Sequence, residues 1–167
     1  RGEKLSFSQE DLSINGHSLE IRIYAEDPRN NFLPDIGTLV TYKRPQGPGV
    51  RVDDTLEEGM AIPIYYDPMI AKLITHGKNR EEAIQRMVRA IDEYEISGLQ
   101  TTLPFCKYAI THDAFTSGNF DTHFVSQYFS DPSVLDSHDK DEVEAAAILI
   151  SDLLKTSSQN DISSDMA

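Results

Sequence analysis

The sequence has a single cysteine, few basic residues and no long apolar run, and each shortage excludes a class of protein. Cys106 cannot close a disulfide within the chain, form a Cys-x-x-Cys pair or supply a thiolate zinc cluster. Fifteen basic residues stand against 28 acidic ones, and the net charge of −13 disfavours nonspecific binding to nucleic acid or anionic membranes. No apolar stretch approaches the roughly 20 residues that cross a bilayer, and the first four residues lack the basic-then-apolar pattern of a signal peptide. We therefore expect a soluble intracellular protein, or an internal piece of one, with no nucleic-acid or membrane partner.

The length and the distribution of charge predict one packed domain followed by an acidic extension. The 167 residues, of which 39% are hydrophobic, suffice for one domain with a modest core. More than half of the excess negative charge lies in residues 131–167, which make up less than a quarter of the chain. We predict a domain over 1–130, and over 131–167 an acidic linker, one amphipathic helix at about 139–155 and a polar tail. This helix either packs on another surface or belongs to a solvated, disordered tail.

Alternating apolar residues and turn residues predict strands in the first half of the chain. In 17–25 apolar and polar residues alternate with the period of a half-buried strand, which places Glu20 and Arg22 on one face. Segments 38–43 and 50–52 flank a Gly-Pro-Gly turn. Segment 69–75 is more continuously apolar, which predicts a central strand.

Helical spacing follows the strands. Asn79 is a suitable N-cap, Glu82 has the capping-box spacing, and apolar residues then recur at helical intervals until residues 97–98 end the helix. Shorter helices are predicted over about 102–111 and from 121 or 122 to 129. Because the strands come first and the helices last, we predict an α+β fold with an antiparallel, sheet-rich core and helices following it.

Common catalytic and metal-binding motifs are absent from the sequence. It contains no GxxxxGK[ST] or GxGxxG phosphate loop, no HExxH and no GxSxG. The five histidines show no metal-ligand spacing, so we interpret each as structural. Lys72 lies in an apolar strand and is either a catalytic base or, as the alternation favours, a charge on the solvated side of a sheet.

Two local features stand out as candidate sites. The 17–25 strand carries Arg22 among carboxylates, which is either a functional guanidinium on a rigid support or, as composition alone favours, part of a salt-bridge lattice. Asp67 lies between two tyrosines and a proline before the 69–75 strand, and is either a site carboxylate or a turn former.

These two features belong to a longer series of motifs. They are GHSLEIRIYAEDP at 16–28, FLP at 32–34, GVRVD at 49–53, YYDPMIAKLI at 65–74, NREEAI at 79–84 and GLQT at 98–101. In these motifs the sequence resembles the C-terminal segment of biotin carboxylase, the ATP-dependent component of acetyl-CoA, propionyl-CoA and pyruvate carboxylases. The resemblance fades after about residue 129 and covers roughly three quarters of the chain.

The resemblance implies a ligase of the ATP-grasp type, of which this chain would be the C-terminal domain. Such enzymes use ATP and magnesium to activate bicarbonate, and they carboxylate a ureido nitrogen of carrier-bound biotin. Arg22 matches the family arginine that stabilises negative charge on the ureido oxygen and contacts bicarbonate. A guanidinium suits this role because it stays charged and offers a planar fork of donors. The alternatives are a non-catalytic assembly or dimerisation module of a biotin-dependent carboxylase, and a generic α+β ligand-binding domain whose match to these motifs is accidental.

The resemblance also implies roles for residues around Arg22. Support of the biotin and bicarbonate site is implied for Asp67, Tyr66 and Glu20. Arg51 aligns with an arginine near the family's dimer interface, but the aromatic residue that some members carry a few residues earlier is replaced around Pro48, which leaves the dimer contact open. Thr122 aligns with a position near the adenine edge of the nucleotide.

The remaining parts of such an enzyme are expected outside this segment. The family's nucleotide loop, ATP-contacting lysines, magnesium-binding glutamates and general-base glutamate precede it, and the sequence has no Met-Lys-Met biotinylation site. We therefore expect no metal site here, binding of ATP, Mg²⁺ and biotin only in the full-length enzyme, and no activity of this piece alone. The expected partners are the N-terminal and ATP-grasp parts of the same enzyme, a biotin carboxyl carrier domain, a carboxyltransferase subunit and a second copy in a homodimer.

The final carboxyl acceptor is not fixed by this sequence, because the carboxyltransferase selects it. An acetyl-CoA acceptor would place the enzyme in fatty acid biosynthesis. The expected compartment is the cytoplasm, or the mitochondrial matrix if the organism is a eukaryote.

Overall fold

The computed structural model describes residues 2–63, 65, 67–136 and 150. By its internal contacts the chain divides into two compact units, Arg1–Asp121 and Thr122–Ala167. The domain boundary predicted at residue 130 stays a prediction.

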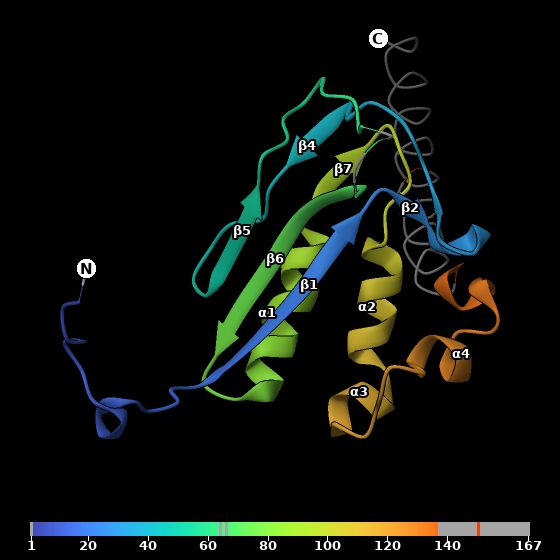
Figure 1. Cartoon of the computed structure of the whole chain (residues 1–167). Helices are drawn as coiled ribbons and strands as arrows, with labels where there is room; N and C mark the ends of the chain where they lie inside the picture. The colour runs from blue at the N-terminus through green and yellow to red at the C-terminus, as the bar shows by residue number, and fades with distance from the viewer. Residues whose placement is uncertain (1, 64, 66, 137–149, 151–167) are drawn as a thin grey trace, which may run out of the picture. The chain divides into compact units, whose positions relative to one another are not determined.

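The first unit is built on a three-stranded antiparallel sheet with the order β1-β6-β5 (Figure 1). Its strands are β1 (His17–Tyr24), β5 (Val50–Asp54) and β6 (Met69–Gly77). The predicted central position of β6 is therefore confirmed. β1 ends one residue earlier than predicted, because the register shifts between Ile23 and Tyr24 and the next backbone N–H, of Ala25, donates to the Pro68 carbonyl at 2.8 Å.

Two small two-stranded sheets extend this unit. One pairs β2 (Glu26–Asp27) with β3 (Leu33–Pro34), and the other pairs β4 (Thr41–Lys43) with β7 (Glu95–Ser97). The strand predicted over 38–43 is shorter than expected because its first residues change partners: Leu39 N–H donates to the Met60 carbonyl, whereas Val40 N–H donates to the Ser97 carbonyl.

Helix α1 (Arg80–Asp92) begins where the sequence predicts and ends earlier. The Asn79 side chain accepts a hydrogen bond from Glu82 N–H at 2.9 Å, which confirms the N-cap. The prediction that the helix continues to residues 97–98 is wrong. Residues 95–97 form β7 because pairing with β4 satisfies their backbone groups, and the apolar spacing alone does not distinguish this strand from a last helical turn.

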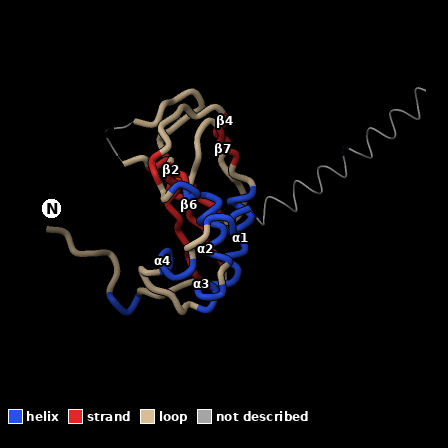
Figure 2. Tube along the Cα trace, turned by 90° about the vertical axis from the view of Figure 1, so that its right-hand side faces the viewer, coloured by secondary structure: helices blue, strands red, loops and turns tan. Residues whose placement is uncertain are grey.

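Helix α2 (Leu103–Thr111) confirms the second predicted helix, and α3 (Asp113–Ser117) is an additional short helix that the sequence analysis missed. In the turned view of Figure 2, α1 and α2 lie on one side of the strands. Short 3-10 segments occur at Gln9–Asp11 and Pro28–Asn30. The α+β class with an antiparallel sheet and following helices is confirmed.

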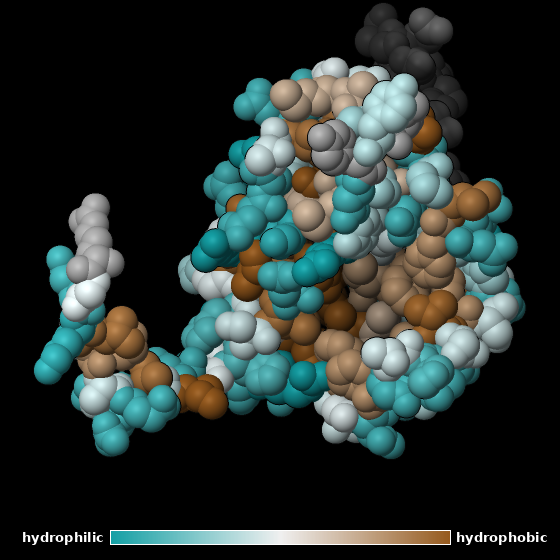
Figure 3. Space-filling model, viewed as in Figure 1, coloured by the Kyte–Doolittle hydropathy of each residue, from teal (hydrophilic) through white to brown (hydrophobic). Residues whose placement is uncertain are grey.

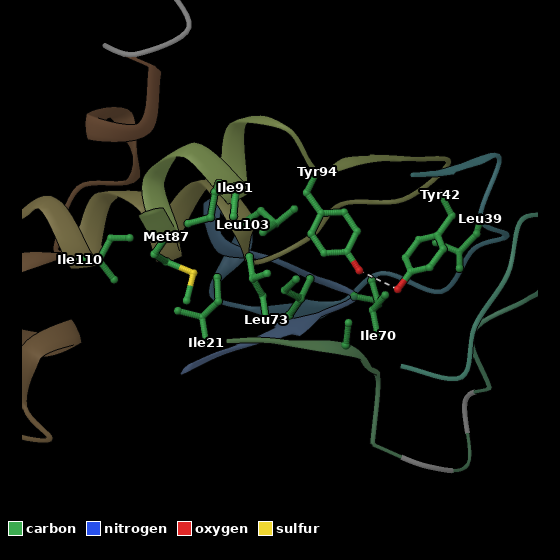
Figure 4. Packing of buried hydrophobic residues seen from close by; sticks show 14 of the residues in the cluster. Ile21, Leu39, Tyr42, Ile70, Leu73, Met87, Ile91, Tyr94, Leu103 and Ile110 are labelled. Atoms are coloured by element: carbon green, nitrogen blue, oxygen red, sulfur yellow. Dashed lines mark hydrogen bonds between the residues drawn. The ribbon is translucent and has the colours of Figure 1, made fainter. Parts of the chain in front are cut away.

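The core of the first unit lies between the sheet and the helices. Ile23 and Leu73 on the sheet and Met87 on α1 are all 0% exposed. Figure 4 shows the buried side chains of this cluster, which come from the sheet, α1 and α2 and point toward one another. At one end of the cluster, Tyr94 and Tyr42 are joined by a hydrogen bond. This packing makes β1 and β6 a rigid support for whatever their opposite face carries.

The second unit, by itself, contains α4 (Phe124–Tyr128) and the 3-10 segment Pro132–Leu135. α4 lies within the helix predicted from 121 or 122 to 129. Apart from Ile150, the helix expected at about 139–155 lies outside the described residues, as do the rest of the acidic linker beyond 136 and the polar tail. Within the described part of the chain, no helix combines the length and the apolar character that crossing a membrane requires.

Candidate functional site

The strand alternation of β1 gives the sheet one buried face and one open face. Ile21 and Ile23 are buried toward the helices, while Glu20 and Arg22 point the other way and are exposed. Figure 1 looks at this open face, with α1 behind the sheet, and Figure 3 shows from the same side hydrophilic residues beside hydrophobic ones over it. The prediction that Glu20 and Arg22 share a face is confirmed.

The register of the sheet arranges the open face in two rows. Arg22 of β1 lies opposite Lys72 of β6, which in turn lies opposite Asp53 of β5. The neighbouring row runs from Glu20 through Ile74 to Arg51. The predicted positions Arg22, Glu20 and Arg51 are thus brought onto one surface, and Lys72 lies on the solvated side as the alternation favours.

Arg22 combines a fixed backbone with an accessible guanidinium. Its side chain is 58% exposed, and its Nε lies 3.7 Å from Oε1 of Glu20. The hydrogen bond to Tyr24, followed by the charge of Glu20, raises the pKa of the Arg22 guanidinium above its usual value. The Glu20 contact is long and open to water, so screening leaves it weak, and it does not occupy the guanidinium fully. The group therefore keeps its charge and has donors available for an anion.

Arg51 is engaged more completely than Arg22. Its Nε and Nη2 donate to the two carboxylate oxygens of Asp53 at 2.7 and 2.8 Å. This hydrogen-bonded pair raises the pKa of Arg51 and lowers the pKa of Asp53. Both side chains are exposed, so Arg51 and Asp53 form a surface ion pair that another protein surface is able to contact.

Asp67 lies at the turn that leads into β6. Its Oδ1 accepts a hydrogen bond from Met69 N–H at 3.2 Å, which is the turn-forming role left open by the sequence. Burial, and then the negative charge of Asp67, raise the pKa of Glu26. The residue after Asp67, Pro68, accepts the Ala25 N–H through its carbonyl, which places this turn next to the end of β1.

The description of this surface does not cover two of the predicted site residues. Tyr66 lies outside the described residues. Thr122 is exposed and belongs to the second unit, which is described separately, so its predicted nucleotide role stays a prediction.

Sequence reasoning missed the contribution of Thr102, which it treated only as the start of a helix. The Thr102 hydroxyl and N–H bond to the backbone of β1 at Arg22 and Tyr24. The contact joins residues about 80 positions apart, so no local signal in the sequence reports it.

A metal site is not assembled by the part of the chain that the structure describes. Among these residues, no group of three or more His, Cys, Asp or Glu lies close enough to hold an ion. A surface hollow of about 710 Å³ lies between α1 and α3, where Arg80, Ile84 and Ser117 line it. It contains none of the predicted site residues.

Residues 20–127 match the protein family described as the biotin carboxylase C-terminal domain. The chain belongs to this family. The match includes the open face of the sheet, from Glu20 and Arg22 to Arg51 and Asp67, and extends into α4. Membership in the biotin carboxylase C-terminal domain family confirms the resemblance on which the site prediction rests.

Named relatives of this biotin carboxylase C-terminal domain come from bacteria and from mammals. Biotin carboxylase 1 of Bacillus subtilis is 49% identical over 127 residues, which cover 76% of this chain and 28% of the relative. The 2-oxoglutarate carboxylase small subunit of Hydrogenobacter thermophilus is 43% identical over 81% of this chain and 28% of the relative. The human mitochondrial propionyl-CoA carboxylase alpha chain is 44% identical over 78% of this chain and 18% of the relative.

A solved structure agrees with these matches. The biotin carboxylase domain dimer of the Hydrogenobacter thermophilus 2-oxoglutarate carboxylase, in complex with MgADP, ADP and bicarbonate, has a TM-score of 0.75 and 42% identity. The match covers 80% of this chain and 29% of that chain. The chain thus spans less than a third of the length of the biotin carboxylases that it matches.

Proposed function

We propose that this chain is the C-terminal domain of a biotin carboxylase and that Arg22 supplies the guanidinium that stabilises charge on biotin during carboxylation. The observation that carries the proposal is the geometry of Arg22. A guanidinium with available donors projects from a rigid strand, on the open face of a domain whose relatives are named biotin carboxylases.

The chemistry explains why an arginine is needed there. A ureido nitrogen of biotin is a poor nucleophile until its proton is removed, and the resulting negative charge spreads onto the ureido oxygen. A fixed cation aimed at that oxygen stabilises the charge as it develops, and removal of one such donor costs about 10²- to 10³-fold in rate. Only an interaction that is stronger in the transition state than in the ground state raises the rate. A rigid β1 holds the Arg22 guanidinium where the negative charge develops, and therefore contributes directly to the role of Arg22.

The neighbouring residues support the same role. Glu20 and Tyr24 keep the Arg22 guanidinium charged and limit the directions in which it turns. Asp67 holds the turn before β6 through Met69 N–H, and thereby helps to fix the strand that pairs with β1. Tyr66 is proposed as a further supporting residue because it adjoins Asp67 in the family motif.

The other wall of the site is proposed to come from the ATP-grasp part of the complete enzyme. The described residues do not gather ligands for magnesium, so no step is assigned to a metal held by this chain. ATP, Mg²⁺ and the biotin of a carrier domain are proposed to meet Arg22 only in that complete enzyme. The carboxyltransferase then decides the acceptor, which includes acetyl-CoA among the proposed possibilities. The cytoplasm, or the mitochondrial matrix in a eukaryote, is the proposed compartment.

The proposal is tested in a complete biotin carboxylase that contains this chain. We expect Arg22→Ala to lower biotin carboxylation about 10²- to 10³-fold while the mass of the assembly is unchanged. Arg89→Ala is the matched control, because Arg89 is an arginine of α1, ion-paired with Glu93 and absent from the open face. Its turnover should stay within about twofold of wild type.

One observation favours a second candidate, an assembly or dimerisation role. Arg51 and Asp53 form an exposed, two-point pair on the same face, and the similar Hydrogenobacter structure is described as a dimer. If assembly is the role of this face, Arg22→Ala and Arg51→Ala change the mass of the complex and leave turnover normal. Normal turnover of Arg22→Ala would contradict the catalytic proposal.

A further inference from the structure

The end of β1 that carries Arg22 lies at an edge of the sheet. Among the described residues, β1 pairs with β6 on one side and with no strand of this sheet on the other. The register with β6 also shifts between Ile23 and Tyr24. Such a shift disturbs the local ladder of hydrogen bonds, so the backbone near Arg22 needs partners from elsewhere to keep one conformation.

Thr102 supplies those partners. Its Oγ1 accepts a hydrogen bond from Tyr24 N–H at 3.0 Å, and its own N–H donates to the Tyr24 carbonyl at 3.1 Å. The same hydroxyl donates to the Arg22 carbonyl over a longer distance of 3.4 Å. A hydroxyl is able to accept and donate at once, so one side chain bridges the backbone on both sides of the register shift.

Thr102 is itself held in place by burial and by its position at the start of α2. Thr102 is only 5% exposed, which protects its hydrogen bonds from competition by water. It precedes α2, whose first residue, Leu103, belongs to the buried core, and its carbonyl accepts Cys106 N–H at 2.9 Å. The strand end is therefore tied to a packed helix and not to a loose loop.

In the described part of the chain, the contacts of the Arg22 guanidinium come from its own strand, from Tyr24 and Glu20, so they move with that strand. The Arg22 side chain is largely exposed and its contact with Glu20 is long, at 3.7 Å. The direction of the side chain consequently depends on the backbone from which it leaves the strand. A catalytic group displaced by about 1 Å loses up to about a hundredfold in rate, so the support of that backbone matters for catalysis.

We propose that Thr102 is a positioning residue for Arg22: its hydroxyl fixes the end of β1 and thereby aims the guanidinium. The inference rests on the proposed function of Arg22. It adds a residue from the start of α2, about 80 positions away in the chain, to the carboxylation site.

The test uses a complete biotin carboxylase that contains this chain, with initial rates of biotin carboxylation as the readout. Thr102→Val removes the hydroxyl and keeps the shape, and we expect it to lower kcat about tenfold or more while the KM for ATP stays within about twofold. Thr102→Ser retains the hydroxyl and should restore most of the turnover. Thr101→Val is the matched control, because Thr101 is also buried but its hydroxyl accepts a hydrogen bond from Leu103 N–H within its own turn. The Thr101→Val enzyme should keep turnover within about twofold of wild type.

A double-mutant cycle separates positioning from general stability. If Thr102 acts through Arg22, Arg22→Ala combined with Thr102→Val should be no slower than Arg22→Ala alone, within about twofold. Losses that multiply would overturn the inference, as would a Thr102→Val enzyme with normal turnover beside an impaired Arg22→Ala enzyme. Normal turnover of Arg22→Ala would instead remove the proposed function, and the inference with it.

A second variant covers the case in which Thr102→Val does not fold. Thr102→Cys has nearly the same size but a much weaker hydrogen-bonding group, so kcat should fall at least about threefold. Hydrogen exchange gives a readout that does not depend on activity: the Tyr24 amide should exchange faster in Thr102→Cys than in Thr102→Ser. Equal exchange and equal turnover in the two variants would overturn the proposal.

Discussion

The hydroxyl groups of Tyr42 and Tyr94 lie 2.7 Å apart in the interior of the first unit, between β4 and the chain that follows α1. Tyr42 also contacts Oδ2 of Asp54 at 2.5 Å, and Arg44 Nε donates to the same oxygen at 2.7 Å. Because a carboxylate only accepts, Tyr42 gives its proton to Asp54 and Tyr94 donates to Tyr42. This chain of hydrogen bonds ties the end of α1 to β4 and β5.

The first prediction concerns the strength of this network. Tyr42→Phe removes the bonds to both Asp54 and Tyr94, and should lower the free energy of unfolding by about 2 kcal/mol. Tyr94→Phe removes one bond and should cost about 1 kcal/mol. Urea unfolding of the 167-residue chain measures both. Tyr65→Phe, at a residue that is 87% exposed, is the control, and a Tyr42→Phe variant as stable as this control would contradict the role of the network.

The second prediction concerns alkaline pH. Burial raises the pKa of Tyr94 to about 12, and burial followed by the bond to Asp54 raises the pKa of Tyr42 still further. Above the ordinary tyrosine pKa of about 10 the unfolded chain therefore loses protons that the folded chain keeps, so stability falls as the pH rises from about 10 to 12. Below about pH 9 these two groups should contribute no pH dependence.

The measurement compares wild type with the Tyr42→Phe/Tyr94→Phe double variant by urea unfolding between about pH 8 and pH 12. The stability advantage of wild type should be constant at the lower end and shrink above about pH 10. An advantage that stays constant over the whole range would show that the two tyrosines are not held in their neutral form.

The third prediction concerns the start of α1. Asn79→Ala removes the acceptor of the Glu82 N–H bond and should lower the free energy of unfolding by about 1 kcal/mol. Asn79→Asp keeps an acceptor and a favourable charge at the helix N-terminus, and should be about as stable as wild type. Asn30→Ala, at an exposed position outside the α-helices, serves as the control. Equal stability of Asn79→Ala and Asn30→Ala would refute the capping role.

The fourth prediction concerns the chain in isolation. The purified 167-residue chain should form no ADP from ATP in a bicarbonate-dependent manner and should not carboxylate biotin. The reason is that Arg22 faces solvent on an open sheet, so a single donor is present without the opposite wall of the site. Bicarbonate-dependent ADP formation, absent from a heat-denatured sample, would contradict this prediction.

The local pattern of the sequence was sufficient for the strand that carries Arg22 and for the N-cap at Asn79, because alternation and capping act over a few residues. It failed at 95–97, where no turn residue stands between Tyr94, the last residue with helical spacing, and Ser97, and only the pairing of Ile96 with Tyr42 of β4 makes a strand. The rows on the open face depend on the register of the strands: Arg22 and Asp53 share a row because each pairs with Lys72 of β6. The sequence pattern of a single strand does not report this register. The contact of Thr102 with β1 is likewise a product of tertiary packing, which no local spacing reports.

The central claim is that a planar guanidinium at position 22 is needed for carboxylation. The most direct measurement is the initial rate of biotin carboxylation by a complete biotin carboxylase carrying arginine, lysine or alanine at this position. The claim predicts the order arginine, lysine, alanine, with Arg22→Lys at least about tenfold below wild type, because an ammonium lacks the two-point fork of donors. Rates of Arg22→Lys and Arg22→Ala within about twofold of wild type would contradict it.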